Sequence, residues 1–299
     1  MKSIKRMALG AMVALMMMTS CGTTQTVPLT GRTHRISVSD EQVLSLSNQE
    51  YTKYMATAKK STNAQHTAMV QRVGRKLATA VETYLKQNGF ANDVKNYAWE
   101  FNLVQDKSAN AFCMPGGKIV VYEGLLPYTQ NETALAIVLG HEIAHAVAKH
   151  SAEQLTKQQN QQVGTNILGN VLNQAVGSGV GDLASAVAGK YFSFRNLKYS
   201  RDNETEADYM GLIFAAMAGY DPQQAIPFWK RMSQGSSSNQ NDIFSDHPSD
   251  AKRIAALQKE MPTALKYYHP AKNTKSLGEN ELTKARADQR MCFRDNLLA

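Results

Sequence analysis

The chain has 299 residues, of which 43% are hydrophobic and 19% are charged. These proportions are typical of a globular protein and exclude bulk disorder, a collagen-like repeat and a protein with many membrane spans. The formal net charge of +8 comes without a basic stripe interleaved with aromatic residues, so we expect no nucleic-acid partner.

The first twenty residues have the three-part pattern of a secretory signal. Three Lys and Arg residues precede an apolar run from Met7 to Met18, which is too short to span a bilayer stably. The small residues that follow end in "MTSC", which resembles a bacterial lipobox and makes Cys21 the predicted lipidation site. The alternative is a plain signal with an incidental cysteine. We therefore expect a lipoprotein signal peptide over 1–20 and a lipidated tether over 21–38, which holds the protein on the periplasmic side of the bacterial envelope, at the outer membrane.

Residues 39–262 carry the patterns of one mainly helical domain with a small sheet. The run from Ser39 to Gln42 resembles a capping box and predicts a helix to about residue 60. Apolar residues at 3–4 spacing predict a second helix over 64–88. Alternation over 97–103 and the apolar run over 119–122, which follows a Pro-Gly-Gly turn, predict two strands.

The second half of this domain reads as helices. A second apparent capping box at Thr129 predicts a helix over about 130–155, and the glycine-containing stretch over 156–199 predicts a loose helical hairpin. Further helices are predicted over 202–218, from Asp221-Pro222 onward and over 248–260. The remaining residues, 263–299, read as a C-terminal tail with one last helix. The fold class we expect is α+β, mainly helical.

The segment "LGHEIAHAVAKH" contains the pattern H-E-x-x-H at His141, Glu142 and His145. Residues four apart share one face of a helix, so both imidazoles point in the same direction and can share one ion. Glu142 is rotated by about 100° from His141 and can take a proton from a water molecule beside the ion. Zinc prefers this donor set, and the apolar flanks argue against two merely solvated histidines.

A catalytic zinc site needs a third protein ligand. His150 lies about 140° around the helix from His145, so we expect it to be a solvated residue near the helix end. Two acidic residues, Glu204 and Asp208, lie four apart on one predicted helix. One can bind the ion while the other accepts a hydrogen bond from a ligand imidazole. The alternative is a solvated acidic helix start that is favoured by the helix dipole.

Four blocks together resemble the HtpX-like gluzincin metallopeptidases, a family that also includes the Oma-type and CAAX prenyl proteases. The blocks are "NAFCMPGGKIVVYEGLL", "LGHEIAHAVAKH", "YSRDNETEAD" and "DHPSDAKRI", and "PLTGRTHRISVSDEQ" resembles the periplasmic lipoprotein members. The resemblance implies a zincin-like fold with the sheet beside the helix that carries the motif. It implies one zinc ion on His141, His145 and Glu204, with Glu142 as the catalytic base and Asp208 in a supporting role.

Comparison with the family pattern singles out three further residues. His247 lies in the block "DHP", where some soluble relatives bring a histidine to the metal, and its alternative is a loop residue before a proline. Arg253 could pair with an acid or stabilise an oxyanion. Cys113 stands where the family has an apolar or small residue, and an exported compartment permits a disulfide with Cys292.

The function we expect is that of a zinc endopeptidase acting on misfolded or unassembled exported proteins. The strand containing Lys118, Ile119 and Val120 is expected at the edge of the cleft, where it would pair with an extended substrate backbone. The alternative is a chaperone-like assembly factor of the outer membrane with latent protease activity, in which case envelope assembly machinery is a partner. A third reading, in which the glycine-rich segment 164–189 engages the membrane, is weakened by the charged and amide residues within it.

Overall fold

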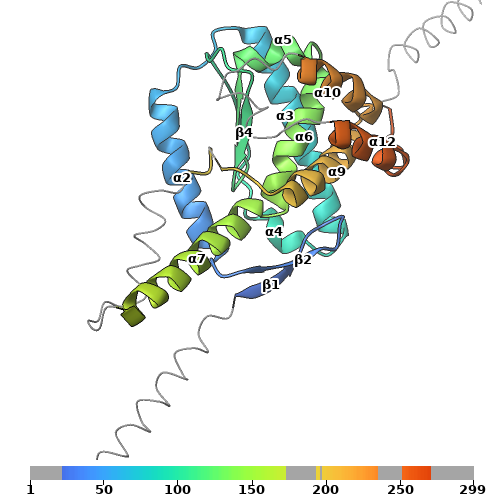
Figure 1. Ribbon diagram of the computed structural model, residues 1–299. Helices are drawn as coiled ribbons and strands as arrows, with labels where there is room; N and C mark the ends of the chain where they lie inside the picture. Colours follow the sequence, from blue (N-terminus) through green and yellow to red (C-terminus); the bar gives the residue numbers. More distant parts are fainter. Residues whose placement is uncertain (1–21, 173–192, 196, 235–250, 271–299) are drawn as a thin grey trace, which may run out of the picture. The chain divides into compact units, whose positions relative to one another are not determined.

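Figure 1 shows a computed structural model of the chain, in which residues 22–172, 193–195, 197–234 and 251–270 are described. The chain divides into two units, Met1–Tyr268 and His269–Ala299. Nearly all of the second unit lies outside the described residues.

The described part of the first unit is mainly helical, with two small sheets. The helices are α2 (Asp40–Thr57), α3 (Ala64–Gln87), α4 (Ala91–Val94), α5 (Leu126–Thr129), α6 (Glu132–Val147), α7 (His150–Leu172), α9 (Arg201–Met217), α10 (Ala225–Gln234) and α12 (Ala251–Leu265), with 3₁₀ turns η2 (Glu123–Leu125) and η3 (Pro222–Gln224). The strands are β1 (Thr23–Thr26), β2 (Thr33–Ile36), β3 (Glu100–Val104), β4 (Ala111–Met114) and β5 (Lys118–Tyr122). The expected α+β, mainly helical fold class is confirmed. None of the described helices is both long enough and apolar enough to span a bilayer.

The larger sheet has the strand order β3-β5-β4, with β5 parallel to β3 and antiparallel to β4. In Figure 1 the sheet lies between α2 on one side and α3 with α6 on the other. Side chains alternate between the two faces, so Ile119 and Val121 join the core around α6 while Val120 and Tyr122 join the core beneath α2. Every residue of β5 is buried for this reason.

The prediction of an edge strand at Lys118, Ile119 and Val120 is wrong. These residues lie in β5, which is the central strand and is paired on both sides. Lys118 is itself buried and donates to the carbonyl of Ala98 at 2.6 Å and to Glu100 Oε1 at 2.7 Å. In the described sheet, the edge strand that packs against α6 is β4.

Helices α6 and α9 pack with their backbones almost in contact. A Cβ atom built on Gly140 would lie 2.6 Å from the carbonyl oxygen of Gly211, and one on Gly211 would lie 2.6 Å from the amide nitrogen of His141. Only glycine fits at both positions, because any larger side chain would push the helices apart. This close approach places the first turns of α9 beside the middle of α6.

The segment 22–38 carries more structure than the expected tether. Strands β1 and β2 form an antiparallel hairpin in the register Thr23 to Ile36. Val27 and Ile36 are almost completely buried, one in each of the two hydrophobic cores. The Thr and Pro residues of this short segment predict a solvated tether, but its buried apolar side chains fasten it to the domain.

The expected helix over 130–155 is two helices. α6 ends at Val147, and Lys149 adopts a left-handed backbone (φ 54°) before α7 begins at His150. The N-cap of α6 is Asn131, whose side chain accepts from the amide of Ala134, whereas Thr129 ends the preceding helix. The capping box at Ser39, in contrast, is confirmed.

Candidate metal centre

Helix α6 is buried along nearly its whole length. Of its 16 residues, 13 are buried, among them His141, Glu142 and His145. It therefore has no solvent-exposed face on which these polar side chains could be hydrated. Groups of this kind are stable in a protein interior only when they have polar partners or an ion.

Helix α9 supplies the acidic partner. Its first turn is fixed by a capping box in which the Ser200 side chain accepts from the amide of Asn203 and the Asn203 side chain accepts from the amide of Ser200. One position further on, Glu204 directs its carboxylate at both imidazoles of α6. The close contact between the two helices is what brings this side chain within reach.

Three ligand atoms converge on one point. His141 Nε2 and His145 Nε2 lie 3.0 Å apart, and Glu204 oxygens lie 3.4 Å from the first and 3.5 Å from the second. These residues form a group of His, Cys, Asp or Glu side chains in the described chain that could hold a metal ion.

The spacing fits zinc. Ligand atoms at about 2.0–2.1 Å from a tetrahedral zinc ion are separated by about 3.3 Å, close to all three distances here. Two nitrogens and one carboxylate oxygen are also the donors of catalytic zinc sites that leave one position open. The predicted ligands His141, His145 and Glu204 thus lie together with the geometry that the ion requires.

His141 has its second ring nitrogen fixed by an acid and an arginine. Its Nδ1 lies 2.9 Å from Asp208 Oδ1, and the same oxygen accepts from Arg253 Nη2 at 2.6 Å. The guanidinium of Arg253 also stacks on Trp229, 3.5 Å from the ring centre. The structure therefore shows Arg253 in the acid-pairing role, behind the ligand. It likewise places Asp208 in the predicted supporting position.

Electrostatics favour a charged acid behind this ligand. Burial would raise the pKa of Asp208, but Arg253 and His141 outweigh burial and lower it. Burial lowers the pKa of His141, yet hydrogen bonds to Asp208 and Glu204 prevail and raise it to about 9. A site with this negative electrostatic potential attracts a cation, either a proton or a metal ion.

His145 is held from two sides. The ring of Tyr199 stacks on it with a centroid distance of 4.0 Å, and Tyr199 is fixed through its hydroxyl by Ser151 at 2.9 Å. The Nδ1 of His145 lies 2.9 Å from Nδ1 of His150. The prediction that His150 is a solvated bystander is wrong, because its side chain is completely buried. The break after α6 turns His150 back toward the ligand, which a continuous helix would not do.

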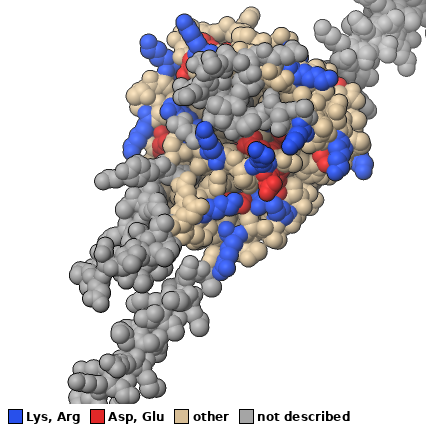
Figure 2. All heavy atoms as spheres, in the orientation of Figure 1, with Lys and Arg blue, Asp and Glu red and all other residues tan. Residues whose placement is uncertain are grey.

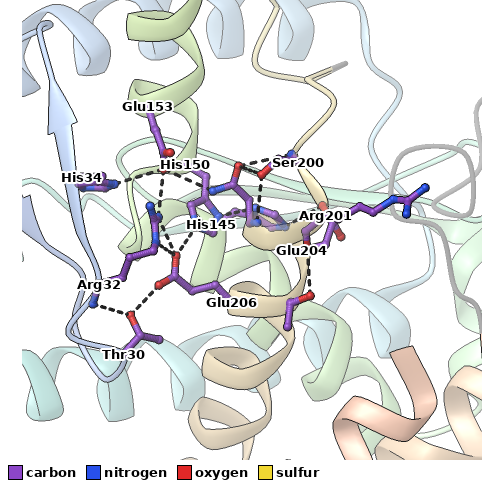
Figure 3. A network of polar contacts seen from close by, with 12 residues as sticks. Thr30, Arg32, His34, His145, His150, Glu153, Ser200, Arg201, Glu204 and Glu206 are labelled. Atoms are coloured by element: carbon purple, nitrogen blue, oxygen red, sulfur yellow. Dashed lines mark hydrogen bonds and ion pairs between the residues drawn. The ribbon is translucent and has the colours of Figure 1, made fainter. Parts of the chain in front are cut away.

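A polar network extends from this histidine to the N-terminal hairpin (Figure 3). His150 Nε2 lies 3.0 Å from Glu206 Oε2, which accepts from Arg32 at 2.7 Å. The other oxygen of Glu206 accepts from Thr30 Oγ1 at 2.6 Å. Arg32 also pairs with Glu153, on the next turn of α7, at 3.0 Å. Burial lowers the pKa of His150, which keeps this ring neutral.

Glu142 follows His141 on α6 and is buried. Burial raises the pKa of the Cys113 thiol in β4, and the Glu142 carboxylate adds to that rise. The predicted base thus lies on the helix that carries two of the ligands and that packs against the edge strand β4.

A comparison with protein families matches residues 64–261 to Peptidase family M48. The chain belongs to this family. The sequence-based assignment to the Oma-like metallopeptidases is thereby confirmed.

Individual relatives agree with the M48 assignment. The chain is 36% identical over 187 residues to mitochondrial metalloendopeptidase OMA1 of Schizosaccharomyces pombe, covering 62% of this chain and 53% of that protein. It is 29% identical over 245 residues to the OMA1 metalloendopeptidase of Homo sapiens, covering 80% and 46%. It is 28% identical over 214 residues to the beta-barrel assembly-enhancing protease of Yersinia pestis, covering 64% and 43%. The chain thus spans about half the length of the curated relatives it matches.

Some expectations fall outside the described part of this M48 chain. His247, Cys21 and Cys292 are not among the described residues, so their roles stay predictions. Cys113 is a buried thiol in β4. Its pairing with Cys292 is likewise untested.

Sequence reasoning missed four residues that surround the M48 ligands. These are His150, Glu206, Tyr199 and Trp229. Glu206 follows Glu204 by two residues and so points to a different face of α9, toward His150. His145 and His150 lie five residues apart, and this spacing predicts a contact between them only once the helix break at Lys149 is known.

Proposed function

We propose that this chain is a zinc-dependent endopeptidase, with one zinc ion per chain, that is anchored as a lipoprotein in the bacterial envelope. Its substrates are misfolded or unassembled exported proteins, and its role is protein quality control. The observation that carries the proposal is the convergence of His141, His145 and Glu204 with spacings of 3.0–3.5 Å beside Glu142. Membership in family M48 and the metalloendopeptidase relatives support it.

The chemistry divides between the ion and the chain's own side chains. A zinc ion bound at such a site acidifies a water molecule and polarises the carbonyl that is attacked. Glu142 accepts the proton from the attacking water and transfers it to the departing amine nitrogen. Asp208 and Arg253 hold the ring of His141 with its Nε2 toward His145 and Glu204, the residues that would hold the ion with it.

An extended substrate would add to the edge strand β4 rather than to β5. β4 is an edge strand of the described sheet, and it packs against α6, which carries His141, Glu142 and His145. Backbone pairing at a sheet edge tolerates many side chains, which suits a protease that clears diverse unfolded proteins.

Cleavage of unfolded casein tests the enzymatic part of the proposal. The purified protein should cleave it, lose the activity when a chelator removes the metal, and regain it with one equivalent of zinc. Cleavage that persists at full rate in metal-free protein would contradict a zinc peptidase.

A second candidate is a chaperone-like assembly factor with latent protease activity, which is favoured by the similarity to the beta-barrel assembly-enhancing protease of Yersinia pestis. If His247 closes the metal site, His247→Ala should cleave casein faster than the wild type. Inactivity of both proteins on unfolded substrates, with zinc bound, would favour the assembly role.

A further inference from the structure

We propose that His150 is a positioning residue for the ligand His145, which it orients through a relay that ends on Glu206 and on Arg32 of the N-terminal hairpin. The proposal rests on the zinc site of the proposed function and concerns how the chain holds one of its ligands. It follows from the contacts that link His145 to His150, His150 to Glu206, and Glu206 to Arg32 and Thr30 of the hairpin (Figure 3).

The first step concerns the proton of His145. This residue can be a ligand through Nε2 only if Nε2 carries no proton, so the proton of the neutral ring must lie on Nδ1. Nδ1 lies 2.9 Å from Nδ1 of His150. The His145 N–H therefore donates to His150, and Nδ1 of His150 must be an acceptor.

The second step fixes the tautomer of His150. With Nδ1 as the acceptor, its own proton lies on Nε2, which is 3.0 Å from Glu206 Oε2. A carboxylate can only accept, so it selects this tautomer and no other. Each ring nitrogen along the path is thus either a hydrogen-bond donor or an acceptor, and each donor faces an acceptor.

The third step is the anchoring of Glu206. Its Oε2 accepts from Arg32 Nε at 2.7 Å and its Oε1 accepts from Thr30 Oγ1 at 2.6 Å. Both donors lie on the segment that joins β1 to β2, more than 170 residues before Glu206 in the chain. The hairpin thereby fixes the end of the relay.

The two ligand histidines are held in parallel ways. His141 reaches a carboxylate directly, at Asp208, and that carboxylate pairs with Arg253. His145 reaches its carboxylate through His150, and that carboxylate pairs with Arg32. The imidazole of His150 spans the distance between His145 and the acid of α9. A metal-ligating histidine ordinarily donates its second ring N–H to an acceptor, and His150 is that acceptor for His145.

Zinc affinity measured by competition with a chelating dye tests the proposal. His150→Leu removes the acceptor and should weaken zinc binding by about 10–100-fold, the usual effect of losing a partner behind a metal ligand. His150→Asn should recover much of this affinity, because its side-chain oxygen lies near the position of Nδ1. Glu206→Gln replaces the carboxylate, which can only accept, by an amide that can also donate, so it no longer selects one tautomer of His150 and should give an intermediate loss.

His34→Leu is the matched control. His34 is a buried histidine that contacts Glu153 in the same network at 3.3 Å but touches no ligand of the metal. Its loss should leave zinc affinity unchanged even if the protein is less stable. An equal loss of affinity in His34→Leu, or wild-type affinity in His150→Leu, would overturn the proposal.

The tautomer can be read in the wild-type protein without any variant. Long-range proton–nitrogen spectra of the zinc-loaded, ¹⁵N-histidine-labelled protein should show His145 protonated on Nδ1 and His150 protonated on Nε2. His150 protonated on Nδ1 would refute the relay even with zinc bound. Failure of the wild type to bind zinc at all would instead refute the proposed function, and this assignment with it.

Discussion

The ligand histidines depend on residues that lie one contact further from the metal. A histidine nitrogen binds zinc well only when the other nitrogen is oriented and carries the proton. Asp208 does this for His141, and we infer that His150 does it for His145. The acids behind both rings are in turn paired with Arg253 and Arg32.

Glu206 should make the fold sensitive to acid. Burial raises its pKa, but hydrogen bonds from His150, Arg32 and Thr30 outweigh burial and lower it from 4.5 to about 2. A carboxylate whose pKa is lowered by folding stabilises the protein above its unfolded pKa. That contribution, on the order of 2 kcal/mol after a discount for solvent screening, is lost as the pH falls from about 4.5 through about 2.

Urea unfolding of metal-free protein measures this contribution. The difference in unfolding free energy between the wild type and Glu206→Gln should shrink steadily as the pH falls from 5 to 2. Other carboxylates titrate in both proteins and cancel in the comparison. A difference that stays constant over this range would contradict the role assigned to Glu206.

The sequence predicts the metal ligands but not the residues that support them. His141, Glu142 and His145 form a pattern within five residues, and Glu204 with Asp208 lies within one helix. The contact of His145 with His150 depends on a backbone turn at Lys149, and its other supports, Tyr199 and Glu206, lie much later in the chain. The spacing of the two histidines alone does not predict these contacts.

Helix α9 is set against α6 by the pair Gly140 and Gly211. The added methyl group of Gly211→Ala would lie 2.6 Å from the backbone nitrogen of His141, so the helices must separate. We expect a cost of about 1–3 kcal/mol in stability. We also expect a clear loss of zinc affinity, because Glu204 moves away from both imidazoles.

Gly74→Ala is the matched control. Its methyl group would overlap the ring of Phe101, where α3 packs on β3, with no ligand nearby. Urea unfolding should show destabilisation in both variants, while dye competition should show weakened zinc binding only in Gly211→Ala. Equal zinc affinity in the two variants would contradict the view that helix spacing sets the site.

Elements with strong periodicity were predictable, and their arrangement was not. The helix over 64–88 was anticipated almost to its last residue, because its apolar spacing is regular. The strand over 119–122 was also found, but its place in the centre of the sheet depends on pairing with β3 and β4. A short apolar run is compatible with a strand at the centre of the sheet or at its edge, so the order of the strands does not follow from the run.

The first unit joins its N-terminal segment to the metal centre. The hairpin β1–β2 buries Val27 and Ile36 and directs Arg32 toward Glu206 (Figures 1 and 3). Figure 2 shows basic and acidic side chains intermingled over one face of the molecule. In the proposed lipoprotein the hairpin follows Cys21 directly, so the anchored end of the domain would begin next to its structured part.

Cys21→Ala tests the anchor. In a bacterial host the wild type should sediment with the membranes, while the variant should remain in the soluble fraction, because it has no acyl chains to insert. Casein cleavage should be the same in both. Cys113→Ala, which removes a buried thiol of β4, should still sediment with the membranes. Identical fractionation of Cys21→Ala and the wild type would contradict lipidation at Cys21.

In the proposed mechanism, metal binding and proton transfer are carried out by different side chains. Glu142 is assigned to the proton and not to the ion, so Glu142→Gln should bind one equivalent of zinc, as the wild type does, and fail to cleave unfolded casein. Metal content and cleavage, measured on the same preparations, test this most directly. Wild-type cleavage by a zinc-loaded Glu142→Gln protein would contradict the mechanism, and loss of zinc in that variant would show that Glu142 belongs to the ligands.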